Sequence, residues 1–303
     1  MIADLVAKDE IKKFFKNELK TKRNFGTYLF YGNDSAQLFD YAIALSKGLC
    51  CQMVENDFCD SCNTCNKINK GVYSDLEVIF DPNGIKVDNV REIIQKSSVT
   101  SFEGKNKIFI LKDVQNMKKE ATNALLKLIE EPNNNCFYIM LTNSLNILPT
   151  IKSRSIILKI KEKTAEDLGV NHVIYNFFRG SSSDILAFKA SSISMEEDVS
   201  YDKIGVHLKK YIEEKDFYSK VSVYKAIRDF LDNRSYLTLQ DKLYFIEEIL
   251  KNSGTREIYK EIINYTIGTM TYADGIEKRL ELKLKLKFPI NIKLALINIF
   301  VNS

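Results

Sequence analysis

Short apolar runs alternate with amphipathic stretches along the first 160 residues of the chain. The runs predict buried strands at residues 28–31, 76–80, 107–111, 137–141 and 156–158. Apolar residues at helical spacing predict helices at residues 1–20, 35–51, 87–97 and 117–131. Strands that alternate with helices imply a parallel sheet with helices on both of its faces. We therefore expect an α/β domain over residues 1–160.

Beyond residue 160 the pattern becomes almost entirely helical. Helical spacing is clearest at residues 221–231, 239–250 and 256–272. The Ser-rich stretch from Gly180 to Ser200 is typical of connections between small elements. Residues 280–286 alternate Leu with charged residues, as a strand does, but an i, i+4 apolar stripe over 276–288 and strong helix formers favour a helix there.

Composition narrows the class of protein only slightly. The 303 residues are 45% apolar and 28% charged, which fits a chain that forms a sizeable core. The net charge of +4 is too small to indicate nucleic-acid binding by itself. Because the sequence has neither a long apolar run nor a secretory signal pattern, we expect no membrane span and a cytoplasmic location.

Six cysteines are present, and five of them fall between Cys50 and Cys65. In a chain without a secretory signal, such clustering indicates a metal site more than disulfides. Cys59, Cys62 and Cys65 form a C-x-x-C-x-x-C motif, whose spacing lets thiolates converge on one zinc ion. The fourth ligand is expected to be Cys51, with Cys50 as the alternative. Free thiols or an iron–sulfur cluster are the rival interpretations.

A zinc held by four thiolates has no open coordination position, so the predicted site would stabilise the fold and take no part in catalysis. The remaining cysteine, Cys136, borders a predicted buried strand and is expected to be an inert core residue.

A strand followed by Gly32 and a helix is where a phosphate-binding loop belongs. That loop requires a second glycine, a lysine for the phosphates and a hydroxyl for Mg²⁺. The chain instead carries Gln37, Leu38 and Phe39 at those three positions. The strand at residues 107–111 should end in an aspartate that holds Mg²⁺, but Lys112 follows it. Both halves of an ATP site are therefore expected to be lost.

Four segments, in order, resemble the delta-prime family of bacterial DNA polymerase III clamp-loader subunits, within the AAA+ class. The first is the cysteine module at about residues 50–66. The others are IKVDNVRE at 85–92, similar to I-x-V-D-x-I-R-E; ATNALLKLIEEP at 121–132, similar to A-x-N-A-L-L-K-x-L-E-E-P; and LPTIKSRS at 148–155, similar to L-P-T-I-x-S-R-C. The final cysteine of the last pattern is Ser155 here, and the sensing arginine of related ATPases is absent from residues 180–184.

This resemblance implies an AAA+ domain over 1–160, a helical lid domain over 161–202 and a helical collar domain over 203–303. It implies that Arg154, supported by Ser153, is an arginine finger that reaches ATP bound on a neighbouring subunit. The implied partners are gamma/tau-type ATPase subunits, a delta subunit and, through the complex, the sliding clamp and primed DNA. The implied cofactor is structural zinc, with no ATP bound by this chain.

Two other functions remain open at this point. One is an active AAA+ ATPase of the gamma/tau type with an unusual loop. The other is a zinc-dependent DNA-binding module, which the acidic Glu55, Asp57 and Asp60 beside the cysteines disfavour, since only Lys67 and Lys70 oppose them nearby.

Overall fold

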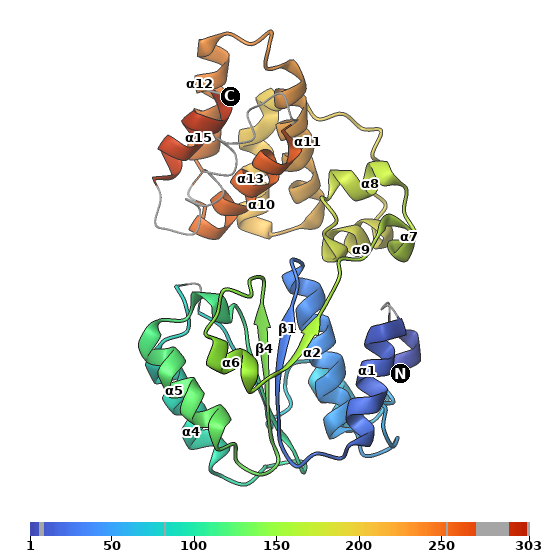
Figure 1. Cartoon of the computed structure of the whole chain (residues 1–303). Helices are drawn as coiled ribbons and strands as arrows, with labels where there is room; N and C mark the ends of the chain where they lie inside the picture. Colours follow the sequence, from blue (N-terminus) through green and yellow to red (C-terminus); the bar gives the residue numbers. More distant parts are fainter. Residues whose placement is uncertain (6–8, 82, 253, 271–290, 302–303) are drawn as a thin grey trace. The chain divides into compact units, whose positions relative to one another are not determined.

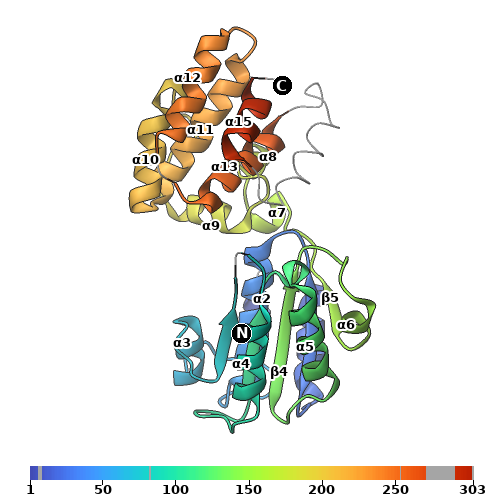
Figure 2. The ribbon, with the colours of Figure 1, turned by 90° about the vertical axis from the view of Figure 1, so that its left-hand side faces the viewer.

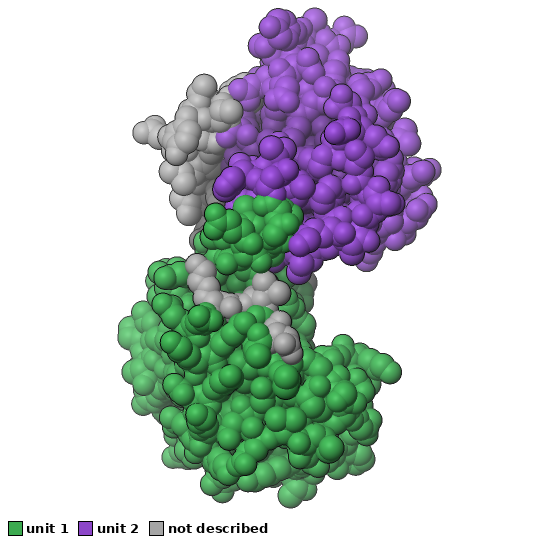
Figure 3. All heavy atoms as spheres, turned by 90° about the vertical axis from the view of Figure 1, so that its right-hand side faces the viewer, with its two compact units in different colours: residues 1–170 green, residues 171–303 purple. Residues whose placement is uncertain are grey.

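The computed structural model describes residues 1–5, 9–81, 83–252, 254–270 and 291–301. It divides into two compact units, residues 1–170 and residues 171–303, coloured separately in Figure 3. The finer boundaries between α/β, lid and collar domains stay a prediction. Within these described ranges, no helix is long and apolar enough to cross a membrane.

The first unit is built on a five-stranded sheet whose paired strands all run parallel, as the alternating pattern predicted. The strand order across the sheet is β2-β3-β4-β1-β5. The strands are β1 (Gly26–Tyr31), β2 (Leu76–Ile79), β3 (Lys107–Leu111), β4 (Cys136–Thr142) and β5 (Ile156–Lys159). Each one lies on a predicted apolar run, because strands covered on both faces need apolar residues at consecutive positions.

Successive strand residues pack into two separate cores, one on each face of the sheet. On β1, Phe30 packs on one face, while Leu29 packs on the other. The first face is covered by α1 (Asp9–Lys20), α2 (Ser35–Cys50) and α3 (Asn63–Asn69), and the second by α4 (Val87–Ser97), α5 (Lys119–Glu130) and α6 (Pro149–Ser153) (Figure 1). Figure 2 shows α4 and α5 side by side in front of the sheet. The predicted α/β architecture is thus confirmed.

The remaining described elements are helical, and all but the first two lie beyond residue 160, where the sequence predicted helices. They are η1 (Ile2–Asp4), η2 (Val114–Asn116) and α7 (Ala165–Leu168) in the first unit, and α8 (His172–Phe177), α9 (Ser182–Ala190), η3 (Tyr201–Lys203), α10 (Ile204–Glu214), α11 (Phe217–Asn233), α12 (Leu239–Leu250), α13 (Arg256–Thr269) and α15 (Ile292–Phe300) in the second. Phe230, Phe245 and Phe300 meet inside the second unit, with ring centroids 4.2 to 5.2 Å apart.

One sequence expectation about the second unit was wrong. The Ser-rich stretch from Gly180 to Ser200 is not simply a connection, because α9 occupies its first half. The hydroxyl of Ser181 accepts a hydrogen bond from the amide of Asp184 and so caps the helix, a role that serine fills well. The helix predicted over residues 276–288 lies outside the described residues.

Candidate functional site

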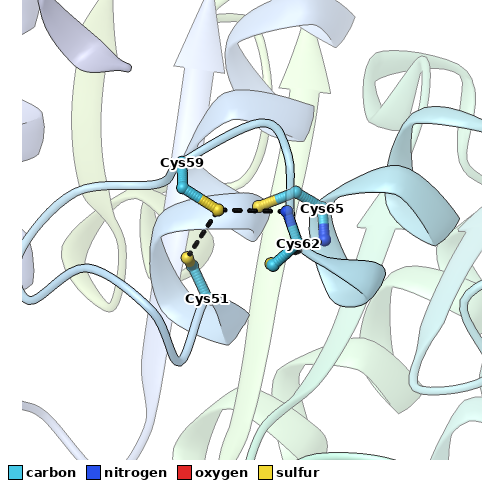
Figure 4. Close-up of side chains that lie close together, drawn as sticks. All are labelled: Cys51, Cys59, Cys62 and Cys65. Carbon is cyan, nitrogen blue, oxygen red and sulfur yellow. Dashed lines mark hydrogen bonds between the residues drawn. The ribbon is translucent and has the colours of Figure 1, made fainter.

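Four cysteine side chains converge beside the first core of the α/β unit. Cys51 follows the last residue of α2, Cys59 lies in the loop after it, and Cys62 and Cys65 begin α3. Their sulfur atoms all lie within 4.8 Å of one another (Figure 4). The structure therefore brings together the four residues that the motif and the end of α2 predicted.

The spacing of the sulfurs suits a tetrahedral metal ion. The sulfur atoms of Cys51 and Cys59 are 3.8 Å apart. Four sulfurs at about 2.3 Å from a zinc ion would lie roughly 3.8 Å from one another. The amide of Cys62 donates to the sulfur of Cys59 at 3.2 Å, and the amide of Cys65 donates to the sulfur of Cys62 at 3.4 Å. Amide donors form stronger hydrogen bonds with a charged thiolate than with a neutral thiol. Thiolates are also soft ligands, so this set of sulfurs fits a metal such as zinc.

Hydrogen bonds and burial act differently on the cysteines. Hydrogen bonds from Ser61, joined by those from Cys62, lower the pKa of Cys59 to about 6. Burial raises the pKa of Cys65 above its ordinary value. A metal ion would offset that cost of burial, because it holds the ligating sulfur as a thiolate.

The alternative ligand, Cys50, lies away from the cluster. Its side chain is buried, with its sulfur 3.9 Å from the carbonyl oxygen of Asn106, and burial raises its pKa to about 12. Cys136 is also buried, and its sulfur lies 3.6 Å from the carbonyl oxygen of Ser97. Both have the surroundings of core thiols.

Residues other than the predicted ligands fasten the cysteine loop to its neighbours. Lys47 of α2 forms an ion pair with Asp60 and lies over the ring of the fully buried Phe58, 4.4 Å from its centroid. The amide of Ile2 donates to Asp57 at 2.7 Å. The acidic residues beside the cysteines thus have partners within the chain, which favours a structural module.

The expected phosphate loop folds as a strand, a turn and a helix, but its amides are already engaged. Asp34 caps α2, and its Oδ1 accepts hydrogen bonds from the amides of Ala36 and Gln37, each at 3.1 Å. These amides at a helix start are the groups that a phosphate would otherwise use. The capping carboxylate also places negative charge at the point where a phosphate would need to approach.

The three substituted loop residues serve the fold of the chain. Gln37 is buried and its amide nitrogen lies 3.3 Å from both the carbonyl oxygen of Lys161 and the hydroxyl of Tyr41. Leu38 is 2% exposed and belongs to the first core. Phe39, in the position of the Mg²⁺-binding hydroxyl, packs partly buried against that core.

Lys112 directly follows β3, at the position where an ATPase is expected to carry a metal-binding aspartate. Its ammonium lies 4.8 Å from the ring centroid of Phe39 and 5.4 Å from that of Phe80. Both distances are within the range of cation–π attraction. The positive charge of Lys112 therefore lies against the loop, at the strand end where an ATPase would have a metal-binding aspartate.

Arg154 lies on the surface at the end of α6. Its Nη2 is 2.9 Å from Oε1 of Glu130, and its Nη1 is 3.4 Å from the carbonyl oxygen of Thr150. The hydroxyl of the neighbouring Ser153 donates to the same carbonyl oxygen at 3.0 Å. The side chain of Arg154 is 39% exposed, so another protein can approach its guanidinium.

Comparison with known proteins places the first unit in a recognised family. A family model described as DNA polymerase III, delta subunit, matches residues 7–164. DNA polymerase III subunit delta' of Bacillus subtilis (strain 168) is 30% identical over 147 residues, which are 48% of this chain and 44% of that protein. DNA polymerase III subunit tau of Escherichia coli (strain K12) is 28% identical over 168 residues, which are 55% of this chain and 26% of that protein.

The match spans less than half the length of either of these curated relatives. A solved structure covers nearly the whole chain: the DNA polymerase III gamma subunit-related protein of Thermotoga maritima MSB8 aligns with 96% of this chain and 97% of its own, with a TM-score of 0.65 and 18% sequence identity. That likeness shows that the two proteins share a fold.

Proposed function

This chain belongs to the DNA polymerase III delta subunit family, and from that premise we propose that it is a non-hydrolysing clamp-loader subunit of the delta-prime kind. Its task is to help load a sliding clamp onto primed DNA within a complex that contains gamma/tau-type ATPase subunits and a delta subunit. The observation that carries this function is an exposed arginine in the family's S-R pair, in a chain whose own phosphate loop lacks the residues that ATP chemistry requires.

The loss of ATP chemistry is supported by three replacements that agree with one another. Leu38 and Phe39 take the positions of the phosphate-binding lysine and the Mg²⁺-binding hydroxyl, and Lys112 takes that of the metal-binding aspartate. Asp34 already accepts from two amides of the loop. Binding Mg-ATP would require breaking this cap, moving Lys112 and burying phosphate charge without a lysine to offset it.

Arg154 supplies what a neighbouring subunit needs. An arginine finger stabilises the charge that develops on the transferred phosphoryl group, and a guanidinium suits this task because it stays charged and forks onto phosphate oxygens. Arg154 lies on the surface of the α/β unit within the S-R pair of the family pattern, with Ser153 supporting the end of α6 through its bond to Thr150.

We assign structural zinc to the cysteine cluster. Cys51, Cys59, Cys62 and Cys65 would hold the ion, which when bound neutralises the clustered thiolates and joins the end of α2 to α3. The chain would work in the cytoplasm, where reduced thiols stay available for the metal.

An ATP-hydrolysing gamma/tau-type subunit is the second candidate, because a tau relative matches the chain almost as well as the delta-prime relative does. The residues at the loop and at the end of β3 favour the non-hydrolysing role, since an ATPase needs a metal ligand where this chain has Lys112.

Reconstitution with gamma/tau-type and delta subunits tests the proposal. We expect Arg154→Ala to enter the complex normally and to lower DNA-dependent ATP turnover and clamp loading. A finger can be worth about 10³–10⁵ in rate at its own site, and the whole complex should lose less because its other sites keep their fingers. Arg154→Lys should rescue poorly, because an ammonium does not reproduce the fork.

Two controls separate a lost finger from a damaged fold. The free Arg154→Ala chain should unfold at nearly the same denaturant concentration as the wild type, since its ion pair is exposed. The purified complex must contain the variant in the normal amount. Equal turnover and equal loading in such a complex would show that Arg154 is an ordinary surface residue.

A further inference from the structure

The guanidinium of Arg154 is held by a carboxylate of its own chain. Glu130 is the last residue of α5, and its Oε1 lies 2.9 Å from Nη2 of Arg154. The contact of Nη1 with the carbonyl oxygen of Thr150, at 3.4 Å, keeps the side chain folded back over α6. In this conformation both terminal nitrogens of the guanidinium face acceptors within the chain.

The position of Glu130 makes it a responsive partner. A carboxylate at the end of a helix meets the negative end of the helix dipole, so it gains from a nearby cation more than it would at the start of a helix. Solvent reaches both groups, with 39% of the Arg154 side chain and 44% of the Glu130 side chain exposed. The ion pair is therefore weak enough to exchange.

A triphosphate on a neighbouring subunit would compete with Glu130 for the same donors. Phosphate oxygens carry more negative charge than one carboxylate and accept the guanidinium in a forked geometry. A guanidinium that turns toward such a ligand leaves the single contact with Glu130, because Nη2 cannot stay 2.9 Å from Oε1 while the side chain points to another subunit. The two acceptors thus define two alternative positions of one side chain.

We propose that Glu130 is a latch on Arg154, which holds the guanidinium in the free chain and releases it when nucleotide on a neighbouring subunit offers a stronger acceptor. Glu130 acts as a positioning residue, since it touches Arg154 and not the nucleotide. The release step rests on the proposed finger function, whereas the latch contact belongs to this chain alone. The device would limit misplaced contacts of an exposed arginine before assembly.

The latch is testable in the free chain. Phenylglyoxal modifies exposed guanidinium groups, and peptide mass spectrometry reports the rate at Arg154. Glu130→Gln should raise that rate roughly two- to fivefold, the range expected when an exposed ion pair is lost. Glu131→Gln is the matched control, because it removes the same charge from the next, exposed residue and should leave the rate unchanged. Equal rates in Glu130→Gln and wild type would overturn the latch.

The release step is testable in the reconstituted complex by measuring ATP turnover against ATP concentration. Glu130→Gln should lower the apparent KM for ATP about two- to fivefold while kcat changes little, and it should have no effect in an Arg154→Ala background. An unchanged KM in Glu130→Gln, together with faster modification of Arg154, would overturn competition between the two acceptors. If Arg154→Ala itself leaves turnover unchanged, the finger function fails and the release step fails with it, whereas the modification experiment still decides whether the latch exists.

Discussion

The cysteine cluster and the phosphate loop flank the same helix, α2, and differ in what they retain. At the end of α2, four thiols lie within 4.8 Å and supply all four ligands of a tetrahedral set. At its start, the helix is capped by Asp34, and the loop side chains Gln37 and Leu38 are buried. In our proposal, the domain thus keeps a complete metal site at one end of α2, while a helix cap and packed side chains occupy the loop at the other end.

The side chains at the loop pack against the rest of the domain. Leu38 fills space in the first core, and Lys112 lies against the rings of Phe39 and Phe80. In our proposal, ATP is hydrolysed on a neighbouring subunit, and this chain supplies Arg154 to that site.

Removing one ligand of the cysteine cluster should have the largest effect on the stability of the α/β unit. We expect Cys62→Ser to lose the metal and to lower the free energy of unfolding of this unit by at least about 4 kcal/mol, because metal binding contributes directly to folding. Denaturant titration and elemental analysis of protein purified without chelator measure both quantities.

Cys50→Ala is the control for that change. Its thiol lies away from the cluster, so the variant should keep one zinc per chain and lose only about 1 kcal/mol for the smaller side chain. Loss of metal from Cys50→Ala would show that Cys50, and not Cys51, is the fourth ligand.

A smaller effect is expected at the phosphate loop. Lys112→Met keeps the length of the side chain but removes its charge, so two cation–π contacts are lost and the free energy of unfolding should fall by about 1–2 kcal/mol. Lys119→Met, at an exposed position at the start of α5, should change it by less than about 0.5 kcal/mol. Equal stability of the two variants would show that Lys112 does not support the loop.

The sequence predicted the sheet well, because strands buried on both faces appear as short continuous apolar runs. It predicted three cysteine positions from their spacing but left Cys50 and Cys51 open, since neighbouring residues at a helix end point in different directions and the choice depends on where α2 stops. The first half of the Ser-rich stretch was assigned to connections because serine is common in turns, although Ser181 is used there to start α9.

The contacts that give the site its character were beyond reach of the sequence. Nothing in the local pattern brings Phe39 and Phe80 to Lys112, because Phe39 lies on α2, Phe80 follows β2 and Lys112 follows β3. The pairing of Glu130 with Arg154 depends in the same way on how α5 and α6 pack. Such long-range pairs are set by tertiary structure and not by spacing along the chain.

Native mass spectrometry of the chain in the presence of Mg-ATP tests the contrast between the two sites most directly, since one spectrum reports both ligands. With ATP raised to millimolar concentration, we expect a single species whose mass is that of the chain with one zinc ion and no bound nucleotide. A second species carrying one Mg-ATP at micromolar concentration, or a folded chain without zinc, would contradict the account.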